Sequence, residues 1–206
     1  MLVIGLTGSI AMGKSAAARL LRRARLPVHD SDAAVHVLMG RGGAAVAPLE
    51  AAFPGCVRDG VVDRAILRQR ISGDAAARRR LEAIVHPLVR AATRRFIARH
   101  ARARRRVVVL DIPLLYETSG ERGTDGVVVV SAPSWLQRDR ALRRPGMTPA
   151  LLAAFLSWQM PDLEKRRRAD AIATSALGIA RTRRDLAAAL RRLSARAPKA
   201  WKPGWK

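Results

Sequence analysis

The stretch that decides the fold is Gly8-Ser9-Ile10-Ala11-Met12-Gly13-Lys14-Ser15. It matches the phosphate-loop pattern G-x4-G-K-[ST] in full. The glycines let the backbone turn so that successive N–H groups point at phosphate oxygens. A helix that begins near Lys14 adds its positive end to the same place. The pattern therefore predicts a nucleotide site, and a glycine-containing helix cap is the alternative interpretation.

Two side chains of this loop, and its backbone, have expected roles in nucleotide binding. Lys14 reaches the β- and γ-phosphates of ATP, and the Ser15 hydroxyl ligates Mg²⁺. The backbone N–H groups hold the phosphate oxygens. The predicted ATP-binding residues are Gly8, Ala11, Met12, Gly13, Lys14, Ser15 and Ala16.

Apolar runs alternate with helical segments on both sides of the loop, which predicts an α/β fold with a parallel sheet flanked by helices. A strand over Leu2 to Thr7 is predicted before the loop, and a helix from about Lys14 to Ala24 is predicted after it. Continuous apolar runs are typical of strands covered on both faces. The other predicted strands are Leu26–His29, Val107–Ile112, Gly126–Val130 and Ala171–Ala173, and a covering helix is expected over Ile179–Leu193.

Two segments break this alternation and predict insertions into the core. Residues 33–106 contain helical stretches, such as Arg64–Ile71 and Pro87–Arg106, and no convincing central strand. Residues 134–168 are helical, rich in arginine and interrupted at Pro145-Gly146. We therefore expect a core of residues 1–32, 107–133 and 169–196, a helical region at 33–106, a mobile arm at 134–168 and a frayed tail at 197–206.

The composition narrows the class of protein. Apolar residues make up 49% of the 206 residues, which is ordinary for a globular domain and too high for a disordered chain. The single cysteine, Cys56, excludes an internal disulfide and a zinc site made of several thiolates. No uncharged apolar run is long enough to cross a bilayer, and no positive segment precedes the first apolar run. We expect a soluble, cytoplasmic protein.

The formal net charge of +23 is typical of a nucleic-acid-binding protein. Only five of the 39 basic residues are lysine, and the arginines are scattered along most of the chain. No aromatic residues alternate with them, as a base-stacking surface would require. A GC-rich coding bias therefore explains most of the charge, and we expect no specific nucleic-acid partner.

The sequence favours a small-molecule kinase over the other classes of phosphate-loop protein. A GTPase would carry Asp-x-x-Gly after the third strand, but here the strand ends Asp111-Ile112-Pro113-Leu114. Motor and transporter ATPases need a longer chain or a signature segment that is absent here. Two alternatives remain open: a kinase of another nucleotide or small metabolite, and a basic nucleic-acid-binding protein that uses ATP.

Beyond the loop, a series of motifs resembles the dephospho-CoA kinase family. The resemblance runs from about residue 3 to 190, in the family's order. Each later motif is weak alone, but the series is specific. The motifs are Ile4-Gly5-Leu6-Thr7-Gly8, Asp30-Ser31-Asp32, Gly60-Val61-Val62-Asp63-Arg64, His86-Pro87-Leu88-Val89-Arg90, Pro113-Leu114-Leu115-Tyr116-Glu117, the lid spacing Gln137, Arg140 and Arg144, then Gln159 and Ala169-Asp170.

The resemblance implies a three-layer P-loop kinase core, a helical CoA-binding region at residues 33–106 and a lid at residues 134–168. It implies ATP as phosphoryl donor, Mg²⁺, and dephospho-CoA as the substrate phosphorylated on its ribose 3′-hydroxyl. No membrane partner is expected, and the chain would be a monomer or small homo-oligomer. The sequence departs from the family at four positions: Ala11 and Met12 replace small loop residues, Ala16 replaces a Ser or Thr, and Thr174 stands where many members have Asn.

The resemblance also implies the catalytic groups. Asp32 would accept the hydroxyl proton and orient the oxygen for in-line attack. Its alternative role is to cap a helix beginning at Ala33, and Asp30 competes for either task. Arg140 and Arg144 share one helix face and would neutralise the transferring phosphoryl group, unless they form only a solvated surface.

The remaining candidates face the acceptor substrate or the metal. His86 would contact dephospho-CoA or cap the long helix that follows it. Arg64 and Arg90 are candidate substrate contacts. Asp111, at a strand end, would ligate Mg²⁺ through water, with a turn residue as the alternative interpretation.

Overall fold

The computed structural model describes residues 1–196 and 198. The chain forms two compact units, one made of Met1–His29 with the chain from His100 onward and the other of Asp30–Arg99. The strand β2 (Val28–Asp30) and the helix α5 (Ala75–Arg102) each have residues in both.

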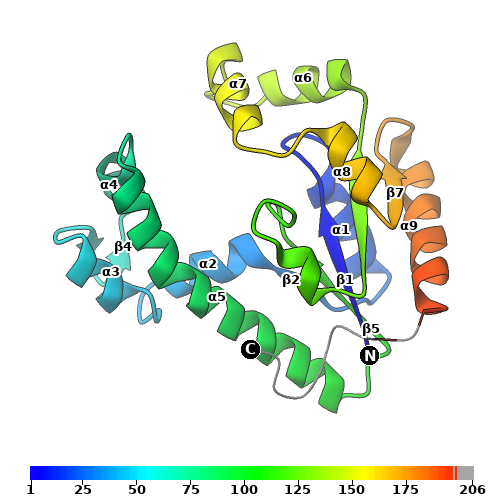
Figure 1. The fold of residues 1–206 in the computed structure, drawn as a ribbon, viewed down its shortest axis with the longest axis horizontal. Coiled ribbons are helices and arrows are strands. Elements are labelled where there is room, and N and C mark those ends of the chain that lie inside the picture. Colours follow the sequence, from blue (N-terminus) through cyan, green and yellow to red (C-terminus); the bar gives the residue numbers. More distant parts are fainter. Residues whose placement is uncertain (197, 199–206) are drawn as a thin grey trace. The chain divides into compact units, whose positions relative to one another are not determined.

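The first unit is built on a five-stranded sheet with the order β2-β5-β1-β6-β7 (Figure 1). The central strand β1 (Leu2–Thr7) pairs in parallel with β5 (Val107–Asp111) and with β6 (Gly126–Ser131), and β6 pairs in parallel with β7 (Ala171–Thr174). Every residue of β1 and of β6 is buried, as the continuous apolar runs predict.

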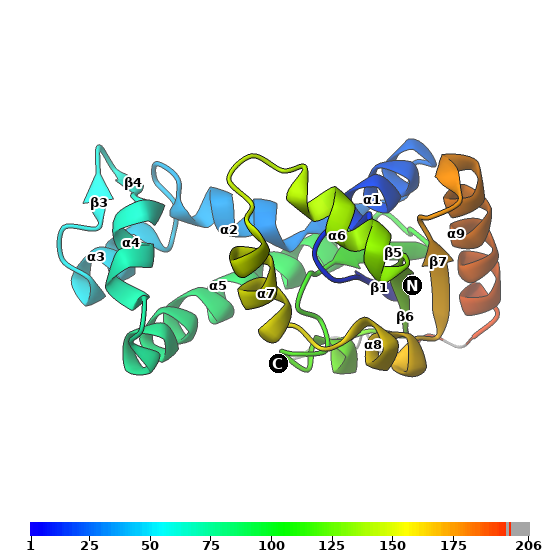
Figure 2. The same ribbon diagram turned by 90° about the horizontal axis from the view of Figure 1, so that it is seen from above.

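Two helices cover one face of this sheet. The apolar side chains of α1 (Lys14–Arg23) and α9 (Gly178–Ser194) pack against alternate residues of β1 and β6. Figure 2 shows α9 alongside β7 at the edge of the sheet. The other face packs on the segment after β5, which includes Leu115 and Tyr116. The three-layer α/β fold predicted from the sequence is confirmed.

The described part of the first unit also contains three further helices and one 3₁₀ turn. The helices are α6 (Ser134–Leu142), α7 (Pro149–Ser157) and α8 (Asp162–Arg168), and the turn is η1 (Gly120–Gly123). In Figure 1, α6 and α7 lie on the side toward which β1 points. This is the carboxyl edge of the parallel strands, where ligands of open α/β sheets bind.

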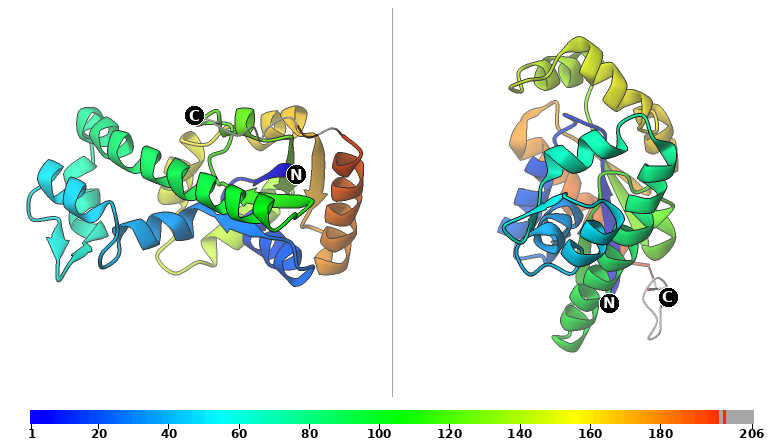
Figure 3. Two further views of the ribbon diagram at one scale, coloured as in Figure 1. Left: turned by 90° about the horizontal axis from the view of Figure 1, so that it is seen from below. Right: turned by 90° about the vertical axis from the view of Figure 1, so that its left-hand side faces the viewer.

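The second unit is mainly helical, with its own apolar core around Leu49, Phe53 and the buried Cys56. Burial raises the pKa of the Cys56 thiol. The short hairpin of β3 (Val57–Arg58) and β4 (Val61–Val62) in this unit, which was not predicted, packs against α3 (Val46–Ala52) (Figure 3). The elements are α2 (Ser31–Met39), α3 (Val46–Ala52), β3 (Val57–Arg58), β4 (Val61–Val62), α4 (Arg64–Ile71) and most of α5.

The long helix α5 begins twelve residues before the expected start at Pro87. Asp74 stands just before it and accepts N–H bonds from Ala76 and Ala77. The bond from Ala77 is the main reason that the pKa of Asp74 is lowered. Since these bonds satisfy N–H groups that have no partner inside the helix, they fix the start of α5.

Among the described residues, no helix is long and apolar enough to span a membrane.

Candidate active site

The phosphate loop lies between β1 and α1, as predicted. Gly13 has φ +90° and stands directly before the first residue of α1. Ala11 has φ +61°, a left-handed conformation that costs a residue with a Cβ roughly 1 kcal/mol or more. Within the described chain, the N–H groups of Ala11, Gly13, Lys14 and Ser15 donate to no protein group. The loop therefore offers four backbone donors to an anionic ligand.

Lys14 and Asp111 meet beside this loop. Lys14 Nζ lies 2.5 Å from Asp111 Oδ1, and only 2% of Asp111 is exposed. The contact follows from the sheet, because Asp111 ends β5 and is in register with Leu6, near the end of β1. Asp111 is therefore a buried strand residue at the phosphate loop, and the alternative of a turn residue is wrong.

The loop is held by hydrogen bonds from three side chains, which lie on α6, between α7 and α8, and after β7. Gln137 Nε2 donates to the Ile10 carbonyl at 2.9 Å, and the Ile10 N–H donates to Gln159 Oε1 at 2.9 Å. Ser175 Oγ donates to the Met12 carbonyl at 2.8 Å. Apolar contacts add to these bonds, since Ala11 packs with Ala141 of α6 and Leu152 of α7.

The two candidate lid arginines differ in their surroundings. Arg140 donates to Ser175 Oγ at 2.7 Å and to the Ser175 carbonyl at 2.8 Å. Since Ser175 contacts Met12, Arg140 is linked to the phosphate loop through one side chain. Arg144 is exposed in the turn after α6. Arg140 is therefore beside the loop, whereas Arg144 is at the surface.

The first unit also contains a buried ion pair. Lys165, on α8, is fully buried, and its Nζ is 2.8 Å from Glu117 Oε1. The contact is ionic, because Lys165 Nζ is buried and makes no hydrogen bond to any described residue. Glu117 Oε1 also accepts the Met160 N–H at 2.8 Å. This pair attaches α8 to the segment after β5.

The paired aspartates have different structural roles. The Asp30 carboxylate accepts the Ala33 N–H at 3.0 Å and caps α2, which begins at Ser31. Asp32 lies within the first turn of α2 and is exposed. The alternative in which Asp32 caps a helix starting at Ala33 is wrong, because Asp30 is the cap.

The three candidate substrate residues of the second unit are exposed basic side chains. Arg64 is the first residue of α4, directly after its cap, Asp63. His86 and Arg90 are four residues apart in α5 and so share one face of it. His86 does not cap a helix, because α5 continues through it, so that alternative is wrong.

The residues around the loop fit a magnesium ion held largely by phosphates and water. Mg²⁺ prefers oxygen ligands, and it usually takes only one or two from protein. Ser15 offers a hydroxyl and Asp111 a carboxylate, both at the loop. Within the described residues, no group of three His, Cys, Asp or Glu side chains forms a metal cage. The donor set thus matches a nucleotide-bound cation rather than a structural metal.

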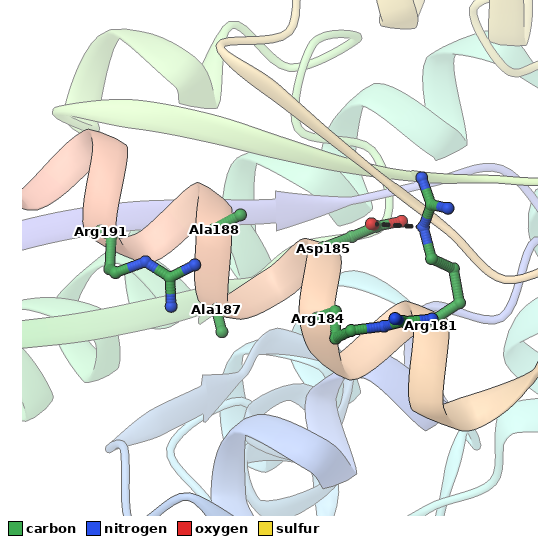
Figure 4. Close-up of a pocket in the computed structure, with 6 residues that line it drawn as sticks. All are labelled: Arg181, Arg184, Asp185, Ala187, Ala188 and Arg191. Atoms are coloured by element: carbon green, nitrogen blue, oxygen red, sulfur yellow. Dashed lines mark hydrogen bonds and ion pairs between the residues drawn. The ribbon is translucent and has the colours of Figure 1, made fainter.

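A shallow hollow on α9 contains none of these residues (Figure 4). Its lining residues are all on that helix: Arg181, Arg184, Asp185, Ala187, Ala188 and Arg191. Arg181 is paired with Asp185 at 2.8 Å, as the dashed line shows. The hollow is part of a solvated helix face and adds nothing to the site at the loop.

Comparison with known proteins agrees with this geometry. The family model described as dephospho-CoA kinase matches residues 2–180. The chain is 64% identical over 166 residues to a dephospho-CoA kinase of Paramagnetospirillum magneticum, covering 81% of this chain and 78% of that one. It is 56% identical to one of Mesorhizobium japonicum, covering 90% and 93%.

A solved structure shares the fold along most of the chain. The crystal structure of TT1252 from Thermus thermophilus is 34% identical, with a TM-score of 0.80, and covers 93% of this chain and 97% of that one. The family model and the relatives indicate the same family, and the observed phosphate loop fits a kinase of that family. The chain belongs to the dephospho-CoA kinase family.

Proposed function

We propose that this protein transfers the γ-phosphoryl group of ATP to the ribose 3′-hydroxyl of dephospho-CoA, giving coenzyme A and ADP. The observation that carries the proposal is the complete phosphate loop, with four backbone donors and the Lys14–Asp111 pair, in a chain of this family. This reaction is the last step of coenzyme A synthesis, and we place it in the cytoplasm.

The loop binds the donor. The N–H groups of Ala11, Gly13, Lys14 and Ser15 hold phosphate oxygens, and Gly8, Met12 and Ala16 complete the cradle. Lys14 moves from Asp111 to the β- and γ-phosphates, where its charge is opposite that of the transferring group. Ser15 and Asp111 would hold Mg²⁺, which neutralises phosphate charge and orients the phosphoryl group when bound.

Asp32 activates the acceptor. In this proposal its carboxylate accepts the 3′-hydroxyl proton and orients the oxygen for in-line attack. The structure supports Asp32 over Asp30 because the Asp30 carboxylate is engaged in capping α2, whereas Asp32 is exposed in the first turn. The positive end of α2 also stabilises a carboxylate at that position.

Arg140 and Arg144 stabilise the phosphoryl group during transfer. Arg140 lies one side chain away from the phosphate loop, through Ser175. The interruption after α6 that carries Arg144 supports residues 134–168 as a lid that brings this arginine to the nucleotide. Both cations act on charge that increases in the transition state.

The helical residues 33–106 bind dephospho-CoA in this proposal. Arg64, His86 and Arg90 are exposed there and provide donors for phosphate and other polar groups of the substrate. The core of this proposal consists of residues 1–32, 107–133 and 169–196. The active species is a monomer or a small homo-oligomer. The predicted tail, 197–206, lies outside the described residues except for Pro198.

The acceptor is tested by measuring ADP release with dephospho-CoA, with nucleoside monophosphates and with RNA. We expect turnover only with dephospho-CoA, and coenzyme A as the product by mass spectrometry. Faster turnover with a nucleoside monophosphate would identify another kinase, and RNA-dependent ATP hydrolysis would favour the nucleic-acid alternative. Either result would overturn the proposal.

The base is tested with Asp32→Asn and Asp30→Asn. Asp32→Asn should lower kcat by roughly 10²–10⁴-fold with little change in substrate affinity, because a proton acceptor acts mainly in the transition state. Asp30→Asn should have the smaller effect, since asparagine caps a helix as well as aspartate does. If Asp30→Asn is the inactive variant and Asp32→Asn is active, the base is Asp30.

A further inference from the structure

Two glutamines hold the backbone of the phosphate loop at the same residue. Gln137, on α6, donates its amide N–H to the Ile10 carbonyl, and Gln159, between α7 and α8, accepts the Ile10 N–H. Only 7% of Gln137 is exposed, so this residue has little contact with water. These two bonds fix two successive peptide groups, Ser9–Ile10 and Ile10–Ala11.

The direction of each bond sets which loop N–H groups point at a ligand. In a trans peptide the carbonyl points opposite to the N–H that follows it, and no described peptide bond is cis. Because Gln137 draws the Ile10 carbonyl outward, the Ala11 N–H is turned the other way. Ser175 does the same for the Gly13 N–H by holding the Met12 carbonyl.

The loop needs this external support at Ala11. Its φ of +61° is unfavourable for a residue with a Cβ, so the local backbone does not by itself select the conformation. Ala11 N–H and Gly13 N–H have no protein acceptor in the described chain, which leaves both for phosphate. The glutamine bonds therefore hold a strained segment in its ligand-binding conformation.

We propose that Gln137 and Gln159 are positioning residues for phosphoryl transfer: together they orient the Ile10 peptides so that the Ala11 N–H faces the triphosphate. Both belong to the segment predicted as a lid, so the same bonds couple the lid to the nucleotide. This inference rests on the proposed function for the identity of the donor, ATP. It adds a role for the two glutamines, which do not themselves touch the reacting atoms.

The opposite directions of the two bonds give a matched pair of variants. A glutamate accepts but does not donate when ionised. Gln159→Glu therefore keeps its acceptor for the Ile10 N–H. Gln137→Glu loses its donor and places a carboxylate against the Ile10 carbonyl. Both substitutions add one negative charge beside the same residue, so the comparison cancels the repulsion between that charge and ATP.

The readout is the ATP dissociation constant, measured by calorimetry at a temperature where circular dichroism shows both variants folded. We expect Gln137→Glu to bind ATP about tenfold more weakly than Gln159→Glu. Only Gln137→Glu leaves the Ile10 carbonyl without its donor, and the free energy cost of an unsatisfied buried carbonyl corresponds to a change in affinity of this order. In turnover assays the KM for ATP should rise in Gln137→Glu while the KM for dephospho-CoA stays the same.

A second variant keeps the test valid if Gln137→Glu does not fold. Gln137→Met is close in size and uncharged, and it removes only the donor, so ATP binding should weaken roughly 2- to 12-fold. Equal ATP affinity in the two glutamate variants, or wild-type affinity in Gln137→Met, would overturn the proposal. ATP binding does not require dephospho-CoA. Wild-type protein that binds ATP without phosphorylating dephospho-CoA would therefore refute the proposed function but not the role of the glutamines.

Discussion

Removing the negative charge from the Glu117–Lys165 pair should destabilise the protein strongly. Lys165 is fully buried and Glu117 is the carboxylate at its Nζ, 2.8 Å away. Glu117→Gln preserves the shape and the acceptor for the Met160 N–H but leaves the ammonium without a countercharge. Breaking a buried pair in this way costs about 3–5 kcal/mol, a large part of a typical domain's stability.

The reverse variant should be less damaging. Lys165→Met removes the buried cation and replaces it with an apolar chain of similar length. The Glu117 carboxylate keeps its hydrogen bond from the Met160 N–H, which partly compensates for the loss of the cation. We expect a loss of about 1–3 kcal/mol.

The assay is urea denaturation followed by circular dichroism on wild type, both single variants and the double variant Glu117→Gln with Lys165→Met. The double variant removes both charges and keeps an acceptor for the Met160 N–H. One Glu117 oxygen is buried without a hydrogen bond, so the pair is incompletely satisfied and the uncharged double variant should be close to wild type. A loss below about 1 kcal/mol for Glu117→Gln, or a double variant less stable than either single one, would refute the reasoning.

Two further predictions follow from close packing and from burial. Gly8→Ala should lower the free energy of unfolding by about 1–3 kcal/mol and weaken ATP binding, because the new Cβ would lie 2.5 Å from the Val130 carbonyl oxygen, a backbone atom of β6. Gly40→Ala is the control, since its Cβ would have no neighbour nearer than 3.4 Å. Equal urea midpoints for the two variants would contradict the prediction. The only tyrosine, Tyr116, should titrate with a pKa of about 12, raised chiefly by burial and then by Asp170. Its raised pKa means that the associated stability is present below the ordinary value near 10 and is lost as pH rises through 12; tyrosinate absorbance that appears at its ordinary pH would show that the ring is not buried.

The strands and helices around the phosphate loop were predictable because their signals are local and strong. The expected strand Leu2–Thr7 has the observed bounds, and helix α4, Arg64–Ile71, was also predicted with the observed bounds. The hairpin β3–β4 was missed because two-residue strands have no measurable periodicity. The start of α5 was misplaced because Pro87 is typical of a first turn, whereas here it lies inside the helix.

The site was predicted less completely, because its supporting contacts join residues far apart in the chain. Asp30 rather than Asp32 caps α2, and the sequence alone could not show which of these two aspartates in one motif has this role. The roles of Gln137 and Gln159 depend on a fold that brings them to Ile10. Lys165 had one usable signal: in a chain that uses arginine almost everywhere, it and Lys14 are the only lysines before residue 199.

The most direct test of the account is phosphoryl transfer itself. Wild-type protein and Lys14→Ala are each incubated with ATP, Mg²⁺ and dephospho-CoA, and coenzyme A and ADP are measured by mass spectrometry. Circular dichroism checks the fold of the variant, because the substitution removes the cation that pairs with Asp111. We predict equal amounts of coenzyme A and ADP from the wild type and neither from folded Lys14→Ala. Transfer by Lys14→Ala near the wild-type rate, or a wild type that forms no coenzyme A, would contradict the account.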